Sequence, residues 1–263
     1  MLTAAVTACK TSNSPPAERT GNDDYIAYFV ETPPVIDGNG SDAAWANAKW
    51  QPISYEWMYN PPFSRVSGPD DFSGRFKVVW AADRLYVLAE IIDDIISTTR
   101  ANTPYTNPEN DDCLEIFIDE DASGGNRTSG GGNNFFAYHL SFGGVNVADY
   151  VGGSGSGIQN GMILRNSHFN YVIGKNDAAN TYTWEIEMKV YDSSYPLRRN
   201  PDVPPVTLTE GKRMGFAVAY CDADAKNTRE HFIGSMFVKG STDTARNTSY
   251  LNSSQYAILY LVK

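Results

Sequence analysis

The chain has 263 residues, with 31 acidic against 21 basic side chains and a formal net charge of −10. This charge disfavours nucleic acid as a partner, because binding to phosphates draws on clustered Lys and Arg. Aromatic residues make up 13% of the chain, too many for a disordered protein, and no run of about 18 apolar residues could cross a membrane as a helix.

The amino terminus has the pattern of an export signal. Residues 1–8 (MLTAAVTA) are small and apolar, and Cys9 completes a Val-Thr-Ala-Cys order typical of a bacterial lipobox, in which the Cys carries the lipid. No Lys or Arg precedes the apolar run, so residues 1–9 have the pattern of a truncated signal. Residues 10–24 are polar and lack periodicity, which predicts a flexible tether. We expect a protein that is secreted or held at the bacterial cell envelope, in the outer membrane or periplasm, with the lipid on Cys9 as its only link to a membrane.

Strand patterns follow from residue 25 to the end of the chain. Residues 75–81 (RFKVVWA) and 85–92 (LYVLAEII) are separated by a turn at Asp83 and Arg84, and such a pair predicts a β-hairpin. In residues 181–190 (TYTWEIEMKV) every second side chain is apolar, which predicts one buried and one solvated face. Further strands are predicted at residues 113–119, 135–142, 168–173, 214–221, 231–238 and 255–262.

Gly-rich and Ser-rich segments at residues 121–134 and 151–157 separate these strands and predict long loops. Helical spacing occurs only briefly, at residues 42–48. The pattern as a whole predicts an all-β fold, an antiparallel two-sheet β-sandwich of the jelly-roll type with long Gly-rich loops. We expect residues 25–263 to form this sandwich as a single domain.

Segments in a fixed order resemble the family 9 carbohydrate-binding modules. They are residues 34–45, which open with Pro-Val-Ile-Asp-Gly; 77–87 (KVVWAADRLYV); 110–119 (NDDCLEIFID); 182–189 (YTWEIEMK); and a closing loop and strand at 247–261. The resemblance covers residues 28–263 and implies a β-sandwich, structural calcium ions and a sugar slot near one end of the sandwich. In the family, two aromatic side chains clamp the terminal sugar of a glucan or xylan chain, and polar side chains bind its hydroxyl groups.

The resemblance assigns candidate ligand-binding residues. Tyr250 matches the second clamp aromatic, while Glu109 stands where the first one is expected, with Tyr105 as its nearest replacement. Glu115 matches an acidic partner for sugar hydroxyls, and His139 falls where the family can place a basic one. Aromatic faces suit the apolar C–H faces of a sugar ring, and its hydroxyl groups need polar partners. The resemblance thus implies a non-catalytic module that binds plant-type oligosaccharides or polysaccharides, in polysaccharide capture or catabolism beside glycan-degrading enzymes.

Calcium is the cofactor that the resemblance implies. Acidic pairs are plentiful, and calcium takes six to eight hard oxygen ligands, but no EF-hand spacing is present. By resemblance, the structural calcium site is expected at Asp37, in the Ile-Asp-Gly turn, and nearby Asp42. Cys113 and Cys221 lie inside predicted strands, where buried free thiols and a single disulfide are both open, and no Cys/His spacing indicates zinc.

Other readings stay open at this stage. A glycoside hydrolase or lyase on the same sandwich would use Glu115 or Asp112, since glycosidases need two carboxylates across a sugar cleft. A haem-binding module would use Met162 and His168, and an adhesion or structural protein would bind no ligand. The aromatic residues Trp50, Trp57 and Tyr59 fit either the core edge or a surface for sugar stacking.

Overall fold

The computed structural model describes residues 24–99, 103–127, 135–143, 146–240 and 242–263. The predicted signal at residues 1–9, with Cys9, and the tether as far as residue 23 lie outside this part of the chain. Within it, no helix is long and apolar enough to cross a bilayer.

The prediction of an all-β fold is confirmed, since the described residues form strands and only very short helices. The strands are β1 Tyr25–Phe29, β2 Gln51–Ile53, β3 Tyr55–Tyr59, β4 Phe72–Ala81, β5 Arg84–Asp93, β6 Cys113–Asp119, β7 Phe135–Ser141, β8 Val147–Tyr150, β9 Met162–Leu164, β10 Phe169–Asn176, β11 Thr181–Lys189, β12 Arg213–Asp222, β13 His231–Gly234 and β14 Ala257–Val262. The α-helix is α1, Asp243–Arg246, and 3₁₀ turns lie at Ala43–Trp45, Pro108–Asn110, Asn166–His168, Ser249–Leu251 and Ser253–Gln255.

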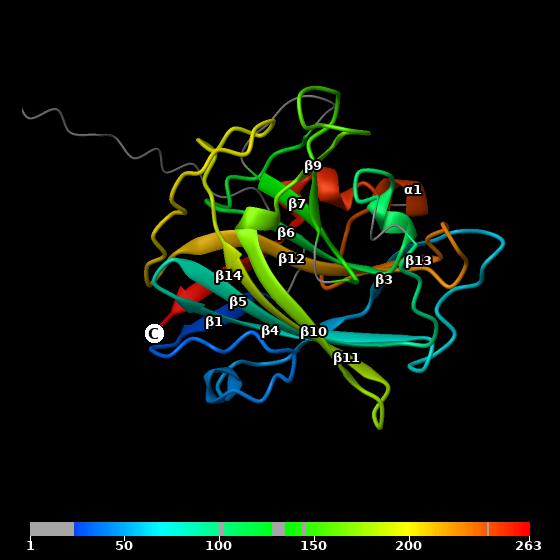
Figure 1. Ribbon diagram of the computed structural model, residues 1–263, viewed down its shortest axis with the longest axis horizontal. Coiled ribbons are helices and arrows are strands. Elements are labelled where there is room, and N and C mark those ends of the chain that lie inside the picture. Colours follow the sequence, from blue (N-terminus) through cyan, green and yellow to red (C-terminus); the bar gives the residue numbers. More distant parts are fainter. Residues whose placement is uncertain (1–23, 100–102, 128–134, 144–145, 241) are drawn as a thin grey trace, which may run out of the picture.

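The strands follow the order β10-β11-β5-β4-β1-β14-β12-β6-β7-β8-β9, with β2, β3 and β13 paired off this path. All pairings are antiparallel except those of β1, which runs parallel to both β14 and β4. The sheet is therefore mixed, and β1 joins the two halves of the sandwich. Alternation within a strand could not reveal this, because it does not show which strands far along the chain pair with β1 or in which direction. Figure 1 shows the two halves as layers, with β4, β5, β10 and β11 beneath β6, β7 and β12.

Aromatic side chains hold the two halves face to face. Phe72 of β4 stacks on Tyr220 of β12 with ring centroids 5.3 Å apart, and Phe76 packs 6.2 Å from Phe216. In β11, Trp184, the clearest of the alternating residues, is fully buried. The predicted buried face of residues 181–190 joins this core, together with alternate residues of β4 and β5. Burial of such large side chains is the main source of stability in a sandwich.

The outer face of β6 is covered as well, so that all seven residues of this strand are buried. Trp57 of β3 and Tyr256, just before β14, both stack on Phe117 of β6. Trp57 is thus a core residue, and its indole N–H donates to the carbonyl of Met236. The guanidinium of Arg75 lies 4.2 Å from the Trp50 ring, so this ring is partly covered too. This second layer leaves a hollow over the outer face of β6 and β7.

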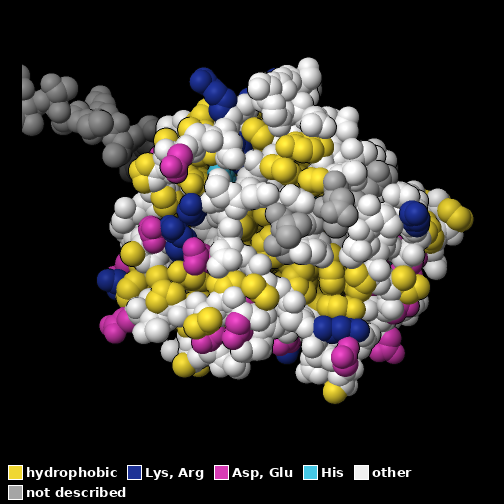
Figure 2. Space-filling view, viewed as in Figure 1, with side chains coloured by type: hydrophobic (Ala, Val, Ile, Leu, Met, Phe, Trp, Pro, Cys, Tyr) yellow, Lys and Arg dark blue, Asp and Glu magenta, His cyan; other side chains and the backbone are white. Residues whose placement is uncertain are grey.

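The surface carries its charges in a mixed pattern. On the face seen in Figure 2, Lys and Arg side chains lie beside Asp and Glu, between patches of apolar side chains. On that face, the described residues form no broad basic area of the kind that a phosphate backbone requires.

Candidate functional site

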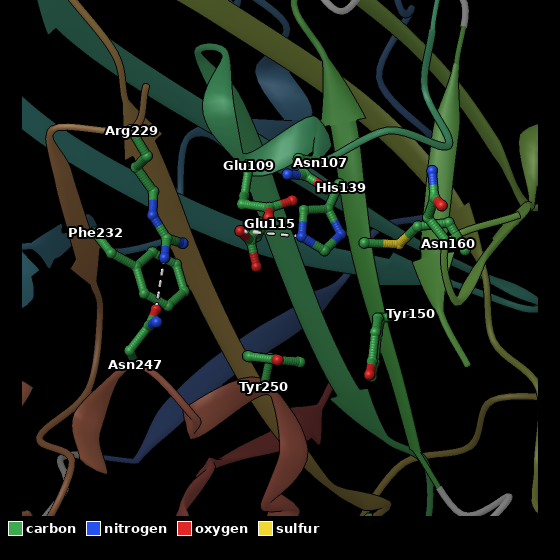
Figure 3. A pocket seen from close by; sticks show the side chains of 11 residues that line it. Asn107, Glu109, Glu115, His139, Tyr150, Asn160, Arg229, Phe232, Asn247 and Tyr250 are labelled. Carbon is green, nitrogen blue, oxygen red and sulfur yellow. Dashed lines mark hydrogen bonds and ion pairs between the residues drawn. The ribbon is translucent and has the colours of Figure 1, made fainter. Parts of the chain in front are cut away.

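A pocket opens in the hollow over β6 and β7 (Figure 3). Its walls come from segments that are far apart in the sequence, including β6, β7, β8, the turn at Pro108–Asn110 and the segment after α1. The residues that line it are Asn107, Glu109, Glu115, His139, Tyr150, Asn160, Met162, Arg229, Phe232, Asn247 and Tyr250. Its volume of about 210 Å³ is below the range of roughly 300–1,000 Å³ usual for drug-sized ligands, so it suits the end of a chain better than a long segment.

The structure brings most of the predicted ligand-binding residues together. Tyr250, Glu115, His139 and Glu109 all line this pocket. Tyr105 does not line it; its backbone carbonyl accepts a hydrogen bond from the amide of Asn160, at 3.0 Å. Tyr105 therefore supports a rim residue and offers no ring to the pocket.

Glu115 and His139 form one side of the pocket from neighbouring strands. They are direct partners in the β6–β7 register, and Glu115 Oε1 lies 3.3 Å from His139 Nε2. The same oxygen accepts a hydrogen bond from the thiol of Cys221, at 2.9 Å. Burial, followed by the neighbouring Cys221, raises the pKa of Glu115 well above its usual range. The carboxyl group thus favours its neutral form, in which it can donate as well as accept.

Two tyrosine rings form the opposite wall. Tyr150, at the end of β8, meets Tyr250 with ring centroids 5.4 Å apart and planes at 90°. In Figure 3, these two rings lie below Glu109, Glu115 and His139. Sequence reasoning missed Tyr150, although an aromatic residue that ends a strand just before the Gly-rich loop at 151–157 was a usable signal. Tyr250 is half-buried, so part of its ring is accessible from the pocket.

Arg127 connects the two chain segments that carry Tyr150 and Tyr250. Its guanidinium donates to the backbone carbonyl of Tyr150, and its backbone N–H donates to the carbonyl of Leu251, next to Tyr250, at 2.7 Å. It forms an ion pair with the buried Asp149, which also pairs with Arg165 at 3.2 Å. A buried charge is stable only when it is paired and hydrogen-bonded, so this network fixes the end of β8 firmly.

Arg229 lies beside this pocket, between Phe232 and Asn247. Its guanidinium carbon is 4.6 Å from the centre of the Phe232 ring, and Nη2 donates to Asn247 Oδ1 at 2.6 Å. Nη1 also reaches the sulfur of Cys221, at 3.5 Å. Sequence reasoning did not select Arg229, because it lies in the loop between β12 and β13, outside every resembling segment.

Several buried polar atoms of the pocket residues lack a partner. Among the described residues, Glu109 Oε2, His139 Nδ1 and Arg229 Nε have no hydrogen-bond partner. Each unpaired buried polar group costs about 1–3 kcal/mol, so three of them around one pocket favour a ligand that supplies the partners.

The predicted calcium residues, Asp37 and Asp42, do not line this pocket. Asp37 is exposed and accepts hydrogen bonds from the backbone and side chain of Asn39. The backbone N–H groups of Asp37 and Gly38 and the indole of Trp45 all donate to the buried Glu185 of β11. Within the part of the chain that the structure describes, neither Asp37 nor Asp42 joins a group of ligand atoms close enough to share one ion.

At the ends of β5 and β12, a different set of carboxylates does lie close enough together to share one ion. One oxygen each of Asp93, Asp222 and Asp224 lies within 4.8 Å of the others, and Asp71 and Asp94 join related groups. Burial and the charge of Asp222 raise the pKa of Asp93 to about 8, and burial and Asp222 raise that of Asp224 to about 7. Asp222 Oδ1 and Asp224 Oδ1 are buried and have no partner among the described residues. Crowded hard oxygens of this kind suit calcium.

Two residues on which the haem-binding and glycoside hydrolase alternatives depend, His168 and Asp112, already have hydrogen-bond partners. His168 bonds Tyr138 through Nδ1 at 2.9 Å and Tyr195 through Nε2 at 3.0 Å, which leaves neither nitrogen free for haem iron. Asp112 accepts hydrogen bonds from the backbone N–H groups of Ser97 and Ala223 and does not line the pocket. Asp112 therefore supports the loop that carries Glu109, and it does not face Glu115 across a sugar cleft.

Comparisons with known proteins agree with this architecture. Two solved structures of a family 9 carbohydrate-binding module from Caldicellulosiruptor kristjanssonii, one with glucose and one with cellotriose, share the fold with a TM-score of 0.57 and 19% identity. The similarity covers 90% of this chain and 95% and 93% of those two chains. No curated protein matches the sequence. The model of the carbohydrate family 9 binding domain-like family matches residues 36–263, so the chain belongs to that family.

Proposed function

We propose that this chain is a non-catalytic binding module for oligosaccharides or polysaccharides of the glucan or xylan type. Family membership and the glucose and cellotriose complexes of the similar module support carbohydrate as the ligand class. The observation that carries the proposal is the pocket itself. It combines two tyrosine rings with three buried polar atoms that lack partners in the described structure.

The tyrosine geometry defines how a sugar ring would lie. A pyranose ring between two parallel aromatic rings needs contacts of about 3.5–4 Å on each face, hence roughly 7–8 Å between the rings. The centroids of Tyr150 and Tyr250 are 5.4 Å apart and perpendicular, so a sugar does not fit between them. We propose that one face of the sugar stacks on Tyr250 while its edge contacts Tyr150, so that the rings form a corner and not a clamp.

The polar side of the pocket then meets the hydroxyl groups. Glu109 Oε2 accepts from a hydroxyl group, Arg229 Nε donates to one, and His139 Nδ1 does either, depending on its tautomer. Glu109 thus takes a polar role at the position where the family resemblance led us to expect an aromatic ring. The buried Glu115 supports His139 through the 3.3 Å contact with Nε2.

The cellular setting remains part of the proposal. A module that captures glycan without cleaving it acts beside glycan-degrading enzymes, and a lipid on Cys9 would hold it at the bacterial envelope. For calcium, Asp93, Asp222 and Asp224 fit the ion better than Asp37 and Asp42 do, because their buried oxygens include unpartnered ones. In that position calcium would neutralise the carboxylates and stabilise the loop from β12 to β13, which carries Arg229.

Isothermal titration against xylo- and cello-oligosaccharides, with calcium present, tests the function. We expect binding of at least one of these sugars with an affinity in the micromolar to millimolar range, and its loss in Tyr250→Ala. Absence of heat with every sugar at millimolar concentration would overturn the proposal. The same samples, incubated with polysaccharide, are assayed for new reducing ends; release that disappears in Glu115→Gln would instead favour a glycoside hydrolase.

A further inference from the structure

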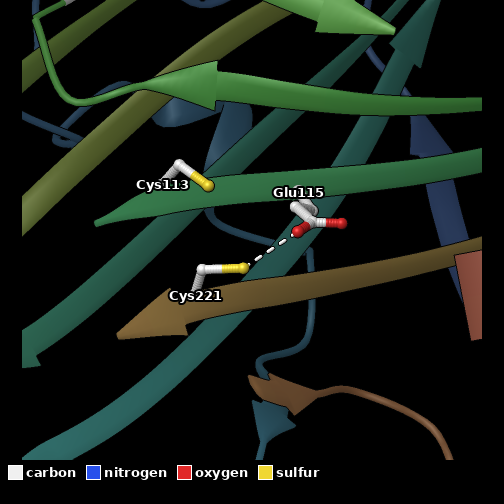
Figure 4. A group of neighbouring side chains, drawn as sticks. All are labelled: Cys113, Glu115 and Cys221. Atoms are coloured by element: carbon white, nitrogen blue, oxygen red, sulfur yellow. Dashed lines mark hydrogen bonds between the residues drawn. The ribbon is translucent and has the colours of Figure 1, made fainter. Parts of the chain in front are cut away.

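Two thiols and the carboxyl group of the pocket residue Glu115 lie close together (Figure 4). Cys113 of β6 and Cys221 of β12 are direct partners in the antiparallel register, and Glu115 lies two residues along β6 on the same face. One ligand atom from each of these three side chains lies within 4.8 Å of the other two. All three side chains are buried, and both cysteines are free thiols.

His139 adjoins this group from the neighbouring strand, but it contacts Glu115 and lies outside the set of atoms within 4.8 Å of one another. Its Nε2 lies 3.3 Å from Glu115 Oε1, the oxygen that also contacts Cys221. Zinc bonds to oxygen and nitrogen are about 2.0–2.2 Å long, so two such ligands at tetrahedral angles stand roughly 3.3–3.5 Å apart. The existing separation of oxygen and nitrogen therefore already matches one edge of a zinc tetrahedron.

The charges of the cluster balance around a divalent ion. Two thiolates and one carboxylate carry three negative charges, and the guanidinium of Arg229, 3.5 Å from Cys221, supplies one positive charge. A divalent cation supplies the other two, so the cation, the four ligands and Arg229 together carry no net charge. Because a buried net charge is costly, this neutrality favours the ion in the presence of Arg229.

A disulfide fits the same pair less well. Residues directly opposite on antiparallel strands have Cβ atoms about 4.5–5.5 Å apart. A disulfide prefers about 3.5–4.5 Å between these atoms. Two thiolates that share an ion make no such demand on the Cβ atoms, and thiolate ligands select soft or borderline ions such as zinc. We propose that Cys113, Cys221 and Glu115 form a site for a divalent cation of the zinc type beside the carbohydrate pocket, which His139 completes as fourth ligand when its ring moves toward the two sulfur atoms.

Cobalt titration of the reduced, metal-free protein tests this proposal without any glycan. The full chain carries Cys9→Ser, so that the remaining cysteines are Cys113 and Cys221. We expect Co²⁺ to bind one to one, with thiolate-to-cobalt charge-transfer bands and the visible bands of a tetrahedral ion, and Zn²⁺ to displace it. Cys113→Ser and Cys221→Ser should each weaken binding at least 100-fold, and His139→Gln about tenfold.

Two control variants separate this site from the other features of the protein. Asp222→Asn, in the acidic cluster, and Tyr250→Ala, in the glycan pocket, should leave the cobalt spectrum unchanged. Loss of the bands in Asp222→Asn would place the ion elsewhere and overturn the assignment. Because the Tyr250→Ala titration contains no sugar, its result does not depend on whether the protein binds glycan.

A second measurement uses protein that keeps Cys113 and Cys221, so its result does not depend on whether the cysteine variants fold. X-ray absorption of the zinc-loaded protein should show two sulfur ligands at about 2.3 Å and two lighter ligands. A shell of oxygen and nitrogen alone would overturn the proposal. So would a thiol assay in denaturant that finds no free thiol in the Cys9→Ser protein as purified, since that result would mean that Cys113 and Cys221 form a disulfide.

Discussion

Tyr150 and Tyr250 meet at right angles, although a hundred residues separate them in the sequence. Tyr150 ends β8, whereas Tyr250 lies in the turn Ser249–Leu251 that leads to β14. Arg127 contacts both segments, through the carbonyl groups of Tyr150 and Leu251. The aromatic corner is therefore fixed by hydrogen bonds to the backbone. Such preorganisation lowers the entropy cost of binding.

The first prediction concerns the stacking surface. Tyr250→Ala should weaken oligosaccharide binding about tenfold, or about 1.4 kcal/mol, because it removes the ring on which the sugar stacks. Tyr250→Phe keeps the ring and should bind within about threefold of the parent. Tyr150→Ala should give a smaller loss, since only the edge of the sugar contacts this ring. Equal affinities of the parent and Tyr250→Ala by titration calorimetry would contradict the stacking model.

The second prediction concerns Glu109. Its Oε2 is buried and has no partner among the described residues, so it costs stability in the free protein and gains a partner only from the ligand. Glu109→Ala should weaken sugar binding about tenfold, while the thermal midpoint stays unchanged or rises. Glu31→Ala removes the same charge from an exposed position outside the pocket and should change neither quantity. A lower midpoint for Glu109→Ala, with unchanged affinity, would show a structural role instead.

The third prediction separates two positions for calcium. Calcium at a hundred times its dissociation constant stabilises a folded protein by about 2.7 kcal/mol, which a thermal melt in calcium against one in chelator detects as a higher midpoint. If the ion sits among Asp93, Asp222 and Asp224, Asp222→Asn abolishes this rise and Asp37→Asn retains it. The opposite result would place the ion at the Ile-Asp-Gly turn, where the sequence resemblance led us to expect it.

The sequence predicted the strands well, because alternation in a segment such as residues 181–190 reflects burial directly. It also selected Glu115 and Tyr250, since these lie in segments that resemble the family, and His139, which falls where the family can place a basic residue. Arg229 was missed because it enters the pocket from a loop, where no periodicity relates a residue to its neighbours in space, and Tyr150 because it ends the short strand β8, which the sequence pattern did not predict. The cysteine cluster was hidden for a similar reason: its four side chains come from three strands, and their proximity depends on strand register, which no short spacing motif records.

The fourth prediction concerns pH and the buried His168. Tyr138 and Tyr195 occupy its two nitrogens, Tyr191 packs against its ring, and the nearest cations are Arg165 and Lys189. Burial, together with these two cations, lowers the pKa of His168 to about 2. In the unfolded chain its pKa is about 6.5, so below that pH the unfolded state binds a proton that the folded state does not.

The contribution of neutral His168 to the free energy of unfolding is therefore fully present above pH 6.5. Below that pH it falls by about 1.4 kcal/mol for each pH unit. Other groups contribute to the total pH dependence, and Asp93, whose pKa is raised to about 8, acts in the opposite direction. The comparison with His168→Gln isolates the histidine, because Gln can still bond both tyrosine hydroxyl groups. Urea unfolding at pH 6.5, 5.5 and 4.5 should show stability falling less steeply in His168→Gln than in the parent. Parallel slopes in the two proteins would mean that His168 gains its proton without unfolding.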